Sequence, residues 1–210
     1  MINILTNEPV GLYFEGLCFL LSEIFDNNSH DAITITNNMT TENMVKADII
    51  IVSLCRGEEY TCKKAFFKKS GSLIIGLIGD NESKSIPLPP CNQRMILISR
   101  RESILSFKEQ IIQAWEHTTL KQQKDEINPC SDCKPKVLTP RLNSIITGML
   151  NGKSISVIAS ELNICEKTVH SHKYTLMKKF FLRNDYDLQI FIRRLGNQEK
   201  LYFGWSVGSE

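Results

Sequence analysis

The stretch that decides the C-terminal fold is "SELNICEKTVHSHKYTLMKKF", residues Ser160 to Phe180. Two segments with helical apolar spacing meet at Asn163-Ile164-Cys165, and the second is rich in His, Lys and Tyr. The pattern predicts a tight turn at these three residues and a helix over about 166–180.

This predicted helix has two unlike faces. Val169, Leu176 and Phe180 recur at the spacing of a buried stripe, with Lys173 or His172 beside them. The opposite face carries hydrogen-bonding and basic groups and almost no acid: Lys167, His170, Ser171, Tyr174 and Lys178. A helix of this kind fits the major groove, where base edges present a donor and acceptor code. Two helices joined by a tight turn form a helix-turn-helix, so the pattern favours DNA binding over a generic solvated bundle.

Further helices are predicted on either side. Thr139 is a good N-cap, Pro140 suits the first helical position, and Gly152 is well placed to end that helix. The buried stripe between them is Leu142, Ile145, Ile146, Met149 and Leu150. A second helix starts near Ser154, with Ile155, Ile158, Ala159 and Leu162 apolar. A last helix covers about residues 185–195, and its apolar stripe is Leu188, Phe191, Ile192 and Leu195.

The string "LTPR…GKSISVIASELNICEKTVHSHKYTLMKKF" resembles the C-terminal helix-turn-helix domain of LuxR/FixJ-type bacterial transcription regulators. The resemblance implies a four-helix domain over 138–210 whose third helix enters the major groove of double-stranded DNA. Carried over by position, the residues that face bases are His170, Ser171 and Tyr174. Those implied near phosphates are Lys153, Lys167, Thr168, Lys173 and Lys178. The last helix would take part in dimerisation through Leu188, Phe191, Ile192 and Leu195.

Two residues depart from the family pattern. Leu142 stands where the family has a Glu, which removes the Glu of a capping box. Cys165 stands where a Ser caps the recognition helix, and Cys is a poor cap. We expect the helix-turn-helix domain to fold but to be less stable than one that has both family residues. The shorter string "TVHSHKYTLMKK" is similar to the enterobacterial capsule-regulator branch, whose members lack phosphorylation and can act as heterodimers with a related regulator.

Residues 1–117 alternate strand and helix signals. The strand signals are "INIL", "AITIT", "DIIIVSL", "LIIGLIG" and "MILIS", several of them continuous apolar runs typical of strands buried on both faces. The helical signals cover 9–25, 58–69 and 102–116. This alternation predicts an α/β domain with a doubly wound parallel sheet.

That order resembles a response-regulator receiver domain, but the phosphorylation chemistry is missing. The position expected for the phosphoacceptor aspartate is Ser53, and a hydroxyl cannot form an acyl phosphate. Glu8 is the single acid where a pair is needed to hold Mg²⁺. The position of the usual Lys falls near Arg100, a possible cationic substitute. We interpret the domain as a pseudo-receiver without aspartate phosphorylation, serving as an interaction scaffold.

The remaining features limit the class of protein. Residues 118–137 are polar and without apolar periodicity, which predicts a linker. The formal net charge is −3 for residues 1–117, +1 for the linker and +4 for 138–210, so the basic part is the one expected to meet a polyanion. No apolar run is long enough for a membrane helix, no secretory signal is recognisable, and the odd number of Cys, seven, fits a reducing cytoplasm. We therefore expect a cytoplasmic, nucleoid-associated regulator, homodimeric or heterodimeric, that is not an enzyme and needs no cofactor.

Two alternatives remain open. Cys130 and Cys133 form a C-x-x-C motif, which would suit a thiol redox or metal sensor. The motif lies in the polar linker without a second pair at zinc spacing, so chance pairing is the simpler interpretation. Small-molecule sensing by the N-terminal domain, as in the quorum-sensing branch, would require an antiparallel sheet, and the buried β-branched runs favour a parallel one.

Overall fold

The computed structural model describes residues 1–28, 32–61, 71–79, 88–121 and 138–198. The chain divides into two compact units. The first, which we call the sheet unit, comprises residues 1–54 and 62–133. The second, the helical unit, comprises residues 134–210 together with the short segment 55–61.

The sheet unit has a five-stranded parallel sheet. The strands are β1 (Ile2–Thr6), β2 (Ile33–Thr36), β3 (Ile49–Ser53), β4 (Leu73–Ile78) and β5 (Ile96–Ser99). Their order is β2-β1-β3-β4-β5, and every neighbouring pair is parallel. Both the strand positions and the parallel α/β class predicted from the sequence are confirmed. The register sets Ser53, the last residue of β3, beside Leu77.

Two helices cover one face of this sheet, α1 (Leu12–Asn28) and α3 (Ile104–Lys121). The side chains of their shared core alternate along the strands, as a strand period of two requires. They include Ile4, Ile49, Ile51, Ile75, Leu77 and Ile98 from the sheet and Leu21, Phe25, Phe107 and Ile111 from the helices. The intervening residues Leu5, Ile50 and Val52 are buried as well, so the strands are covered on both faces.

Some local predictions in this unit were wrong or incomplete. The first helix begins at Leu12 instead of Pro9, and α3 continues to Lys121, into the predicted linker. The short helix α2 (Thr41–Lys46) was not predicted, because so short an element has no apolar period. Its signal is the N-cap, where the Thr40 hydroxyl accepts a hydrogen bond from the Asn43 N–H. A second unpredicted element is the 3₁₀ helix η4 (Pro90–Arg94).

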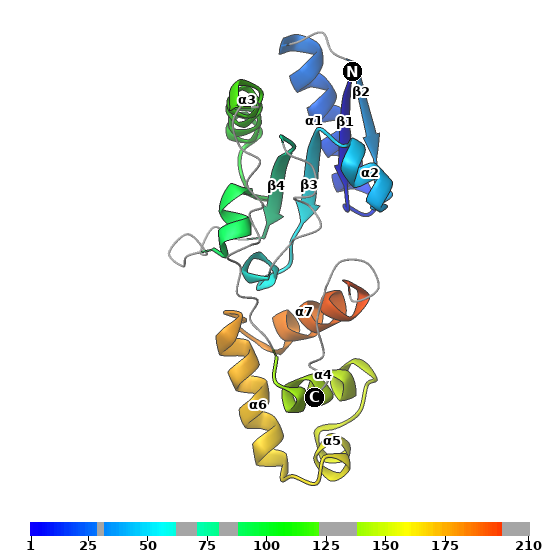
Figure 1. Ribbon diagram of the computed structural model, residues 1–210, viewed down its shortest axis with the longest axis vertical. Helices are drawn as coiled ribbons and strands as arrows, with labels where there is room; N and C mark the ends of the chain where they lie inside the picture. Colours follow the sequence, from blue (N-terminus) through cyan, green and yellow to red (C-terminus); the bar gives the residue numbers. More distant parts are fainter. Residues whose placement is uncertain (29–31, 62–70, 80–87, 122–137, 199–210) are drawn as a thin grey trace. The chain divides into compact units, whose positions relative to one another are not determined.

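Four α-helices form the described part of residues 138–198. They are α4 (Pro140–Leu150), α5 (Ile155–Glu161), α6 (Glu166–Lys179) and α7 (Asp185–Gln198), as Figure 1 shows. The predicted Thr139 cap is present, because its hydroxyl accepts from the Leu142 N–H. The second helix starts at the expected place, and the Ser154 hydroxyl caps it by accepting from the Val157 N–H. Gly152, at φ 71°, follows α4 as expected. Leu142 is buried, so the departure from the family Glu places an apolar side chain in the core.

The segment 55–61 includes a 3₁₀ helix, η1 (Glu58–Tyr60). It begins where a helix over 58–69 was predicted, but residues 62–69 lie outside the described ranges. Most of the predicted linker, with Cys130 and Cys133, also lies outside them. Among the described residues, no helix is both long and apolar enough to span a bilayer.

Candidate nucleic-acid interface

The turn between α5 and α6 has the geometry that the sequence predicted. Asn163 adopts a left-handed conformation, φ 51°, and the Ile164 N–H donates to the Ala159 carbonyl at 2.9 Å. Such a turn ends α5 sharply while satisfying one of its last carbonyls. Val169 of α6 is fully buried against Ile158 and Ala159 of α5. The packing of α6 on α5 therefore fixes which face of α6 is left outside.

That outer face carries the groups predicted to meet DNA. Side chains at helical spacing are exposed along it, namely Lys167, His170, Ser171, Tyr174 and Lys178. Tyr174 is 59% exposed although it is aromatic. The acid of this helix, Glu166, is at its first residue, where a carboxylate favours the helix dipole. The result is a basic, hydrogen-bonding ridge on a helix supported from behind.

The start of α6 is held without a side-chain cap. Cys165 is the N-cap residue and makes no capping hydrogen bond to the backbone, as its poor capping ability predicted. Its Sγ lies 3.1 Å from the Thr168 hydroxyl instead. This contact with the Thr168 hydroxyl lowers the pKa of the Cys165 thiol. Thr168 is thus partly engaged within the helix start.

Two of the lysines predicted near phosphates have intramolecular partners. The Lys173 ammonium lies 2.6 Å from Asp185 Oδ2, and its side chain is only 12% exposed. Lys153 pairs with Glu161 at 2.5 Å. A phosphate would have to displace these carboxylates. Thr175, which the sequence analysis did not single out, is also exposed on α6, and its hydroxyl donates to the Ser171 carbonyl.

The four residues of α7 predicted to mediate dimerisation are all buried in the single chain. Leu188, Phe191 and Ile192 are 0–1% exposed, and Leu195 is 5% exposed. The Phe191 ring packs on Phe180 with centroids 4.7 Å apart. In this form they are interior side chains, and their role in a dimer stays a prediction.

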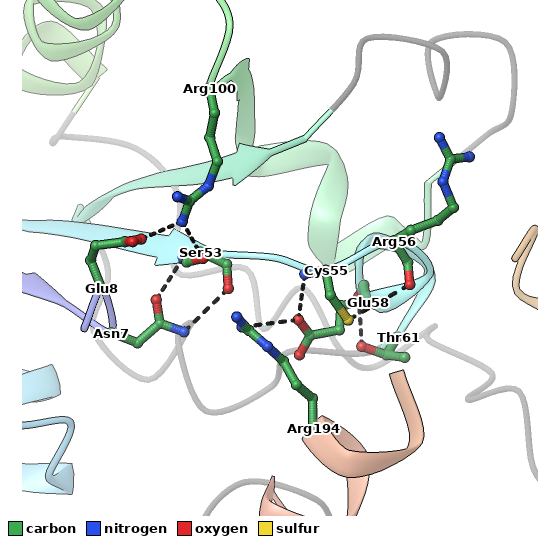
Figure 2. Close-up of polar contacts among 9 residues, drawn as sticks. All are labelled: Asn7, Glu8, Ser53, Cys55, Arg56, Glu58, Thr61, Arg100 and Arg194. Atoms are coloured by element: carbon green, nitrogen blue, oxygen red, sulfur yellow. Dashed lines mark hydrogen bonds and ion pairs between the residues drawn. The ribbon is translucent and has the colours of Figure 1, made fainter. Parts of the chain in front are cut away.

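A polar cluster in the sheet unit lies at the end of β3 (Figure 2). The guanidinium of Arg100, which follows β5, donates to the Ser53 hydroxyl at 2.5 Å and pairs with the Glu8 carboxylate. Asn7 joins the ends of β1 and β3, because its Oδ1 accepts from the Ser53 N–H at 2.6 Å. The sequence identified Ser53, Glu8 and Arg100 separately, and the structure brings them together.

This cluster does not fit the donor set of a phosphorylated receiver. Mg²⁺ prefers several oxygen ligands, and here the one carboxylate is paired with a guanidinium. The Arg100 guanidinium also lies 4.5 Å from the Tyr13 ring centroid, a second contact that holds it in place. The geometry is that of a partly buried ion pair that joins the ends of three strands.

Comparison with known proteins finds a family that matches most of the helices of the helical unit. Residues 136–192 match the family described as "Bacterial regulatory proteins, luxR family". We found no significant match among curated proteins.

Several solved structures are similar along most of the chain. RcsB from Salmonella enterica serovar Typhimurium, bound to promoter rprA with phosphomimetic BeF3⁻, is 14% identical and aligns over 93% of this chain and 100% of that one, with TM-score 0.47. An RcsB–DNA complex is 16% identical over 91% and 98%, with TM-score 0.49. Full-length FixJ from B. japonicum is 14% identical over 93% and 97%, with TM-score 0.37.

Such distant likenesses transfer no function, so the DNA complexes are properties of those proteins. The matched range 136–192 spans the helices α4, α5 and α6 and the first half of α7. Residues 136–192 of the helical unit therefore match a family of bacterial regulatory proteins and fold as a helix-turn-helix, and the sheet unit has the β2-β1-β3-β4-β5 strand order of a receiver-like fold.

Proposed function

We propose that this protein reads specific DNA sequences as a dimer in the cytoplasm, with α6 in the major groove. The observation that carries the proposal is the outer face of α6, where the predicted contact residues are exposed together and the opposite side is buried. A helix supported in this way can enter the groove without unfolding or repacking.

The residues divide by the group they would contact. His170, Ser171 and Tyr174 would face base edges, since they are exposed together in the middle of the helix. Lys167 and Lys178, near the two ends of α6, would contact phosphates, with Thr168 and Lys153 at the margins. Lys173 has weaker support, because Asp185 holds its ammonium.

We also propose that aspartate phosphorylation does not control the protein. Support comes from Ser53, whose hydroxyl accepts a hydrogen bond from the Arg100 guanidinium, and from the ion pair between Glu8 and that guanidinium. Incubation with acetyl phosphate and Mg²⁺ should therefore leave both the intact mass and the DNA affinity unchanged. A stoichiometric phosphoryl adduct accompanied by tighter DNA binding would refute this.

The test of sequence reading is selection of bound duplexes from a random pool by the full-length protein. Tyr174→Ala is the test variant, and Tyr186→Ala is its matched control, because Tyr186 is 72% exposed on α7 and has no proposed contact. We expect an inverted repeat that is enriched by the wild type and by the control, and lost or relaxed in Tyr174→Ala by ~1–3 kcal/mol per base contact.

Other outcomes have definite meanings. Equal enrichment by Tyr174→Ala would remove that side chain from the reading face. Salt-sensitive binding to every duplex without enrichment would refute a self-sufficient homodimer and favour the auxiliary regulator that needs a related partner.

A further inference from the structure

The segment 55–61 is an ordered turn that completes the helical unit. It follows β3 directly, and its own hydrogen bonds shape it. The Cys55 N–H donates to Glu58 Oε2 at 2.8 Å, and the Tyr60 N–H donates to the Gly57 carbonyl at 3.1 Å. Glu58 and Glu59 are 1% and 4% exposed, although both are acids. So much burial of charged groups requires compensating partners.

The partner of Glu58 lies on one stripe of α7, where two ion pairs join the segment to the helix. Arg56 Nε is 3.6 Å from Asp187 Oδ2, and Arg194 Nη1 is 3.4 Å from Glu58 Oε2 (Figure 2 shows the second pair). Gly57 fits between them so closely that a Cβ there would lie 3.1 Å from Phe191 Cδ2. The sequence Arg-Gly-Glu of the segment thus meets Asp187, Phe191 and Arg194 in that order.

The second stripe of α7 has a different role. Leu188, Ile192 and Leu195 are spaced like Asp187, Phe191 and Arg194 but turned by one residue, and they are buried. Hence α7 packs in the helical unit by its apolar stripe and by the Phe191 ring on Phe180. It also presents to the segment a mixed stripe in which Phe191 lies between the opposite charges of Asp187 and Arg194.

This mixed stripe is complementary to itself. In an antiparallel pair of α7 helices with a two-fold axis near Phe191, Asp187 of one copy faces Arg194 of the second copy. At ~1.5 Å rise per residue, Asp187 lies ~6 Å before Phe191 and Arg194 ~4.5 Å after it. The mismatch, ~1.5 Å by the same rise, is within the reach of a flexible Arg side chain.

We propose that residues 55–61 and the α7 helix of a second copy compete for this stripe. The segment offers a cation to Asp187 and an anion to Arg194, as the second copy would. A chain whose segment is docked on α7 is then monomeric, and dimerisation requires the segment to leave. This inference rests on the dimeric DNA binding proposed above and names how that assembly is limited.

Gly57 is the position at which to perturb the contact between residues 55–61 and α7. Its φ is 93°, which disfavours any side chain, and a Cβ would also lie 2.8 Å from Leu182 Cδ2. Gly57→Ala should therefore dislodge the segment while leaving α7 unchanged. Gly11→Ala is the matched control, because a Cβ at Gly11 meets nothing within 4 Å.

Sedimentation equilibrium of the full-length variants measures the competition. We expect a dimer dissociation constant at least tenfold lower in Gly57→Ala and unchanged in Gly11→Ala. Adding Arg194→Glu to Gly57→Ala should abolish the gain, because it sets like charges opposite each other in the antiparallel pair.

Each alternative result is informative. A folded Gly57→Ala variant with unchanged or weaker dimerisation overturns the inference, and so does a gain that survives Arg194→Glu. If no variant dimerises yet Tyr174-dependent DNA reading persists, the inference and the dimer fail while DNA recognition stands. Loss of all sequence-dependent binding would instead reject the proposed function.

Hydrogen exchange of the wild type provides a measurement free of folding artefacts. The amides of Cys55, Tyr60 and Thr61 are hydrogen-bonded within the segment. Adding the selected duplex should accelerate their exchange. Protection that is unchanged by saturating DNA would show that the segment stays docked, contrary to the inference.

Discussion

Removal of the Arg100 guanidinium should destabilise the sheet unit strongly, and Arg100→Met is the substitution that tests this. Glu8 is 6% exposed, and its carboxylate is paired with Arg100. Methionine keeps much of the side-chain volume but offers no donor. The carboxylate would then remain buried without a cation.

The magnitude follows from the burial of the two groups. Removing one partner of a fully buried pair costs ~3–5 kcal/mol. The Arg100 side chain is 28% exposed and that of Glu8 is 7% exposed, so water can reach part of the pair. We discount the penalty to ~2–3 kcal/mol for that reason, which is still a large part of a typical stability of ~5–15 kcal/mol.

The paired substitution separates charge from packing. Glu8→Gln together with Arg100→Met removes both charges, so the double variant should be ~1 kcal/mol more stable than Arg100→Met alone, or better. If the loss of stability in the double variant equalled the sum of the losses in the two single variants, the result would contradict a coupled ion pair.

Urea unfolding followed by Trp115 fluorescence is the assay. Trp115 lies in α3 with its ring edge-on to Phe25 at 5.8 Å, so its emission reports the core of the sheet unit. The second tryptophan, Trp205, is removed as Trp205→Phe in every variant. Lys46→Met, which breaks an exposed pair, is the control and should leave the midpoint unchanged. An Arg100→Met penalty below ~0.5 kcal/mol would refute the reasoning, because a buried carboxylate left alone cannot be that cheap.

Lys178→Ala should weaken binding to all duplexes alike and flatten the salt dependence of the affinity, which titrations at several salt concentrations would measure; a loss confined to the selected site would mean a base contact instead. Cys165→Ser should raise the thermal midpoint of the helical unit, because a Ser hydroxyl can accept a hydrogen bond from the backbone N–H at the start of α6 and the thiol makes no such bond. If Cys165→Ala had the same midpoint as Cys165→Ser, capping would not be the cause. Burial raises the pKa of Glu59, so its carboxyl favours folding when protonated; stability should fall as pH rises from the ordinary carboxyl range through the raised pKa, and Glu59→Gln should remove that slope in pH-dependent urea unfolding. Leu188→Ala should cost ~2–5 kcal/mol in folding, measured by circular dichroism, whereas a normally stable variant that cannot dimerise would make it an interface residue.

The sequence predicts this fold well where the hydrophobic period is long. The runs that became β3 and β4 are continuous and rich in Ile, and the helices α4 and α5 begin at hydroxyl caps. It fails where an element is a single turn, as for α2, or where an exact boundary depends on packing, as at the start of α1. Local propensity cannot fix such boundaries.

The candidate sites were predictable in part for a related reason. Residues on one face of α6 share a helix, so their spacing alone puts them together. Ser53, Glu8 and Arg100 come from three strand ends, and the family resemblance, not the spacing, pointed to them. That Arg100 hydrogen-bonds to Ser53 and pairs with Glu8 could be known only from the sheet topology, in which parallel pairing places the carboxyl ends of β1, β3 and β5 on the same side of the sheet.

The contact of segment 55–61 with α7 shows what sequence patterns cannot express. The apolar stripe Leu188, Ile192 and Leu195 was recognised as one surface together with Phe191, because all four are hydrophobic. In the structure Phe191 has two roles, because its ring packs on Phe180 and it also lies between Asp187 and Arg194 in the stripe that meets residues 56–58. A charge pair separated by more than a hundred residues leaves no local period. The same helix can therefore supply an interior face and a competing, self-complementary face, and only the three-dimensional partner tells which side chain serves which.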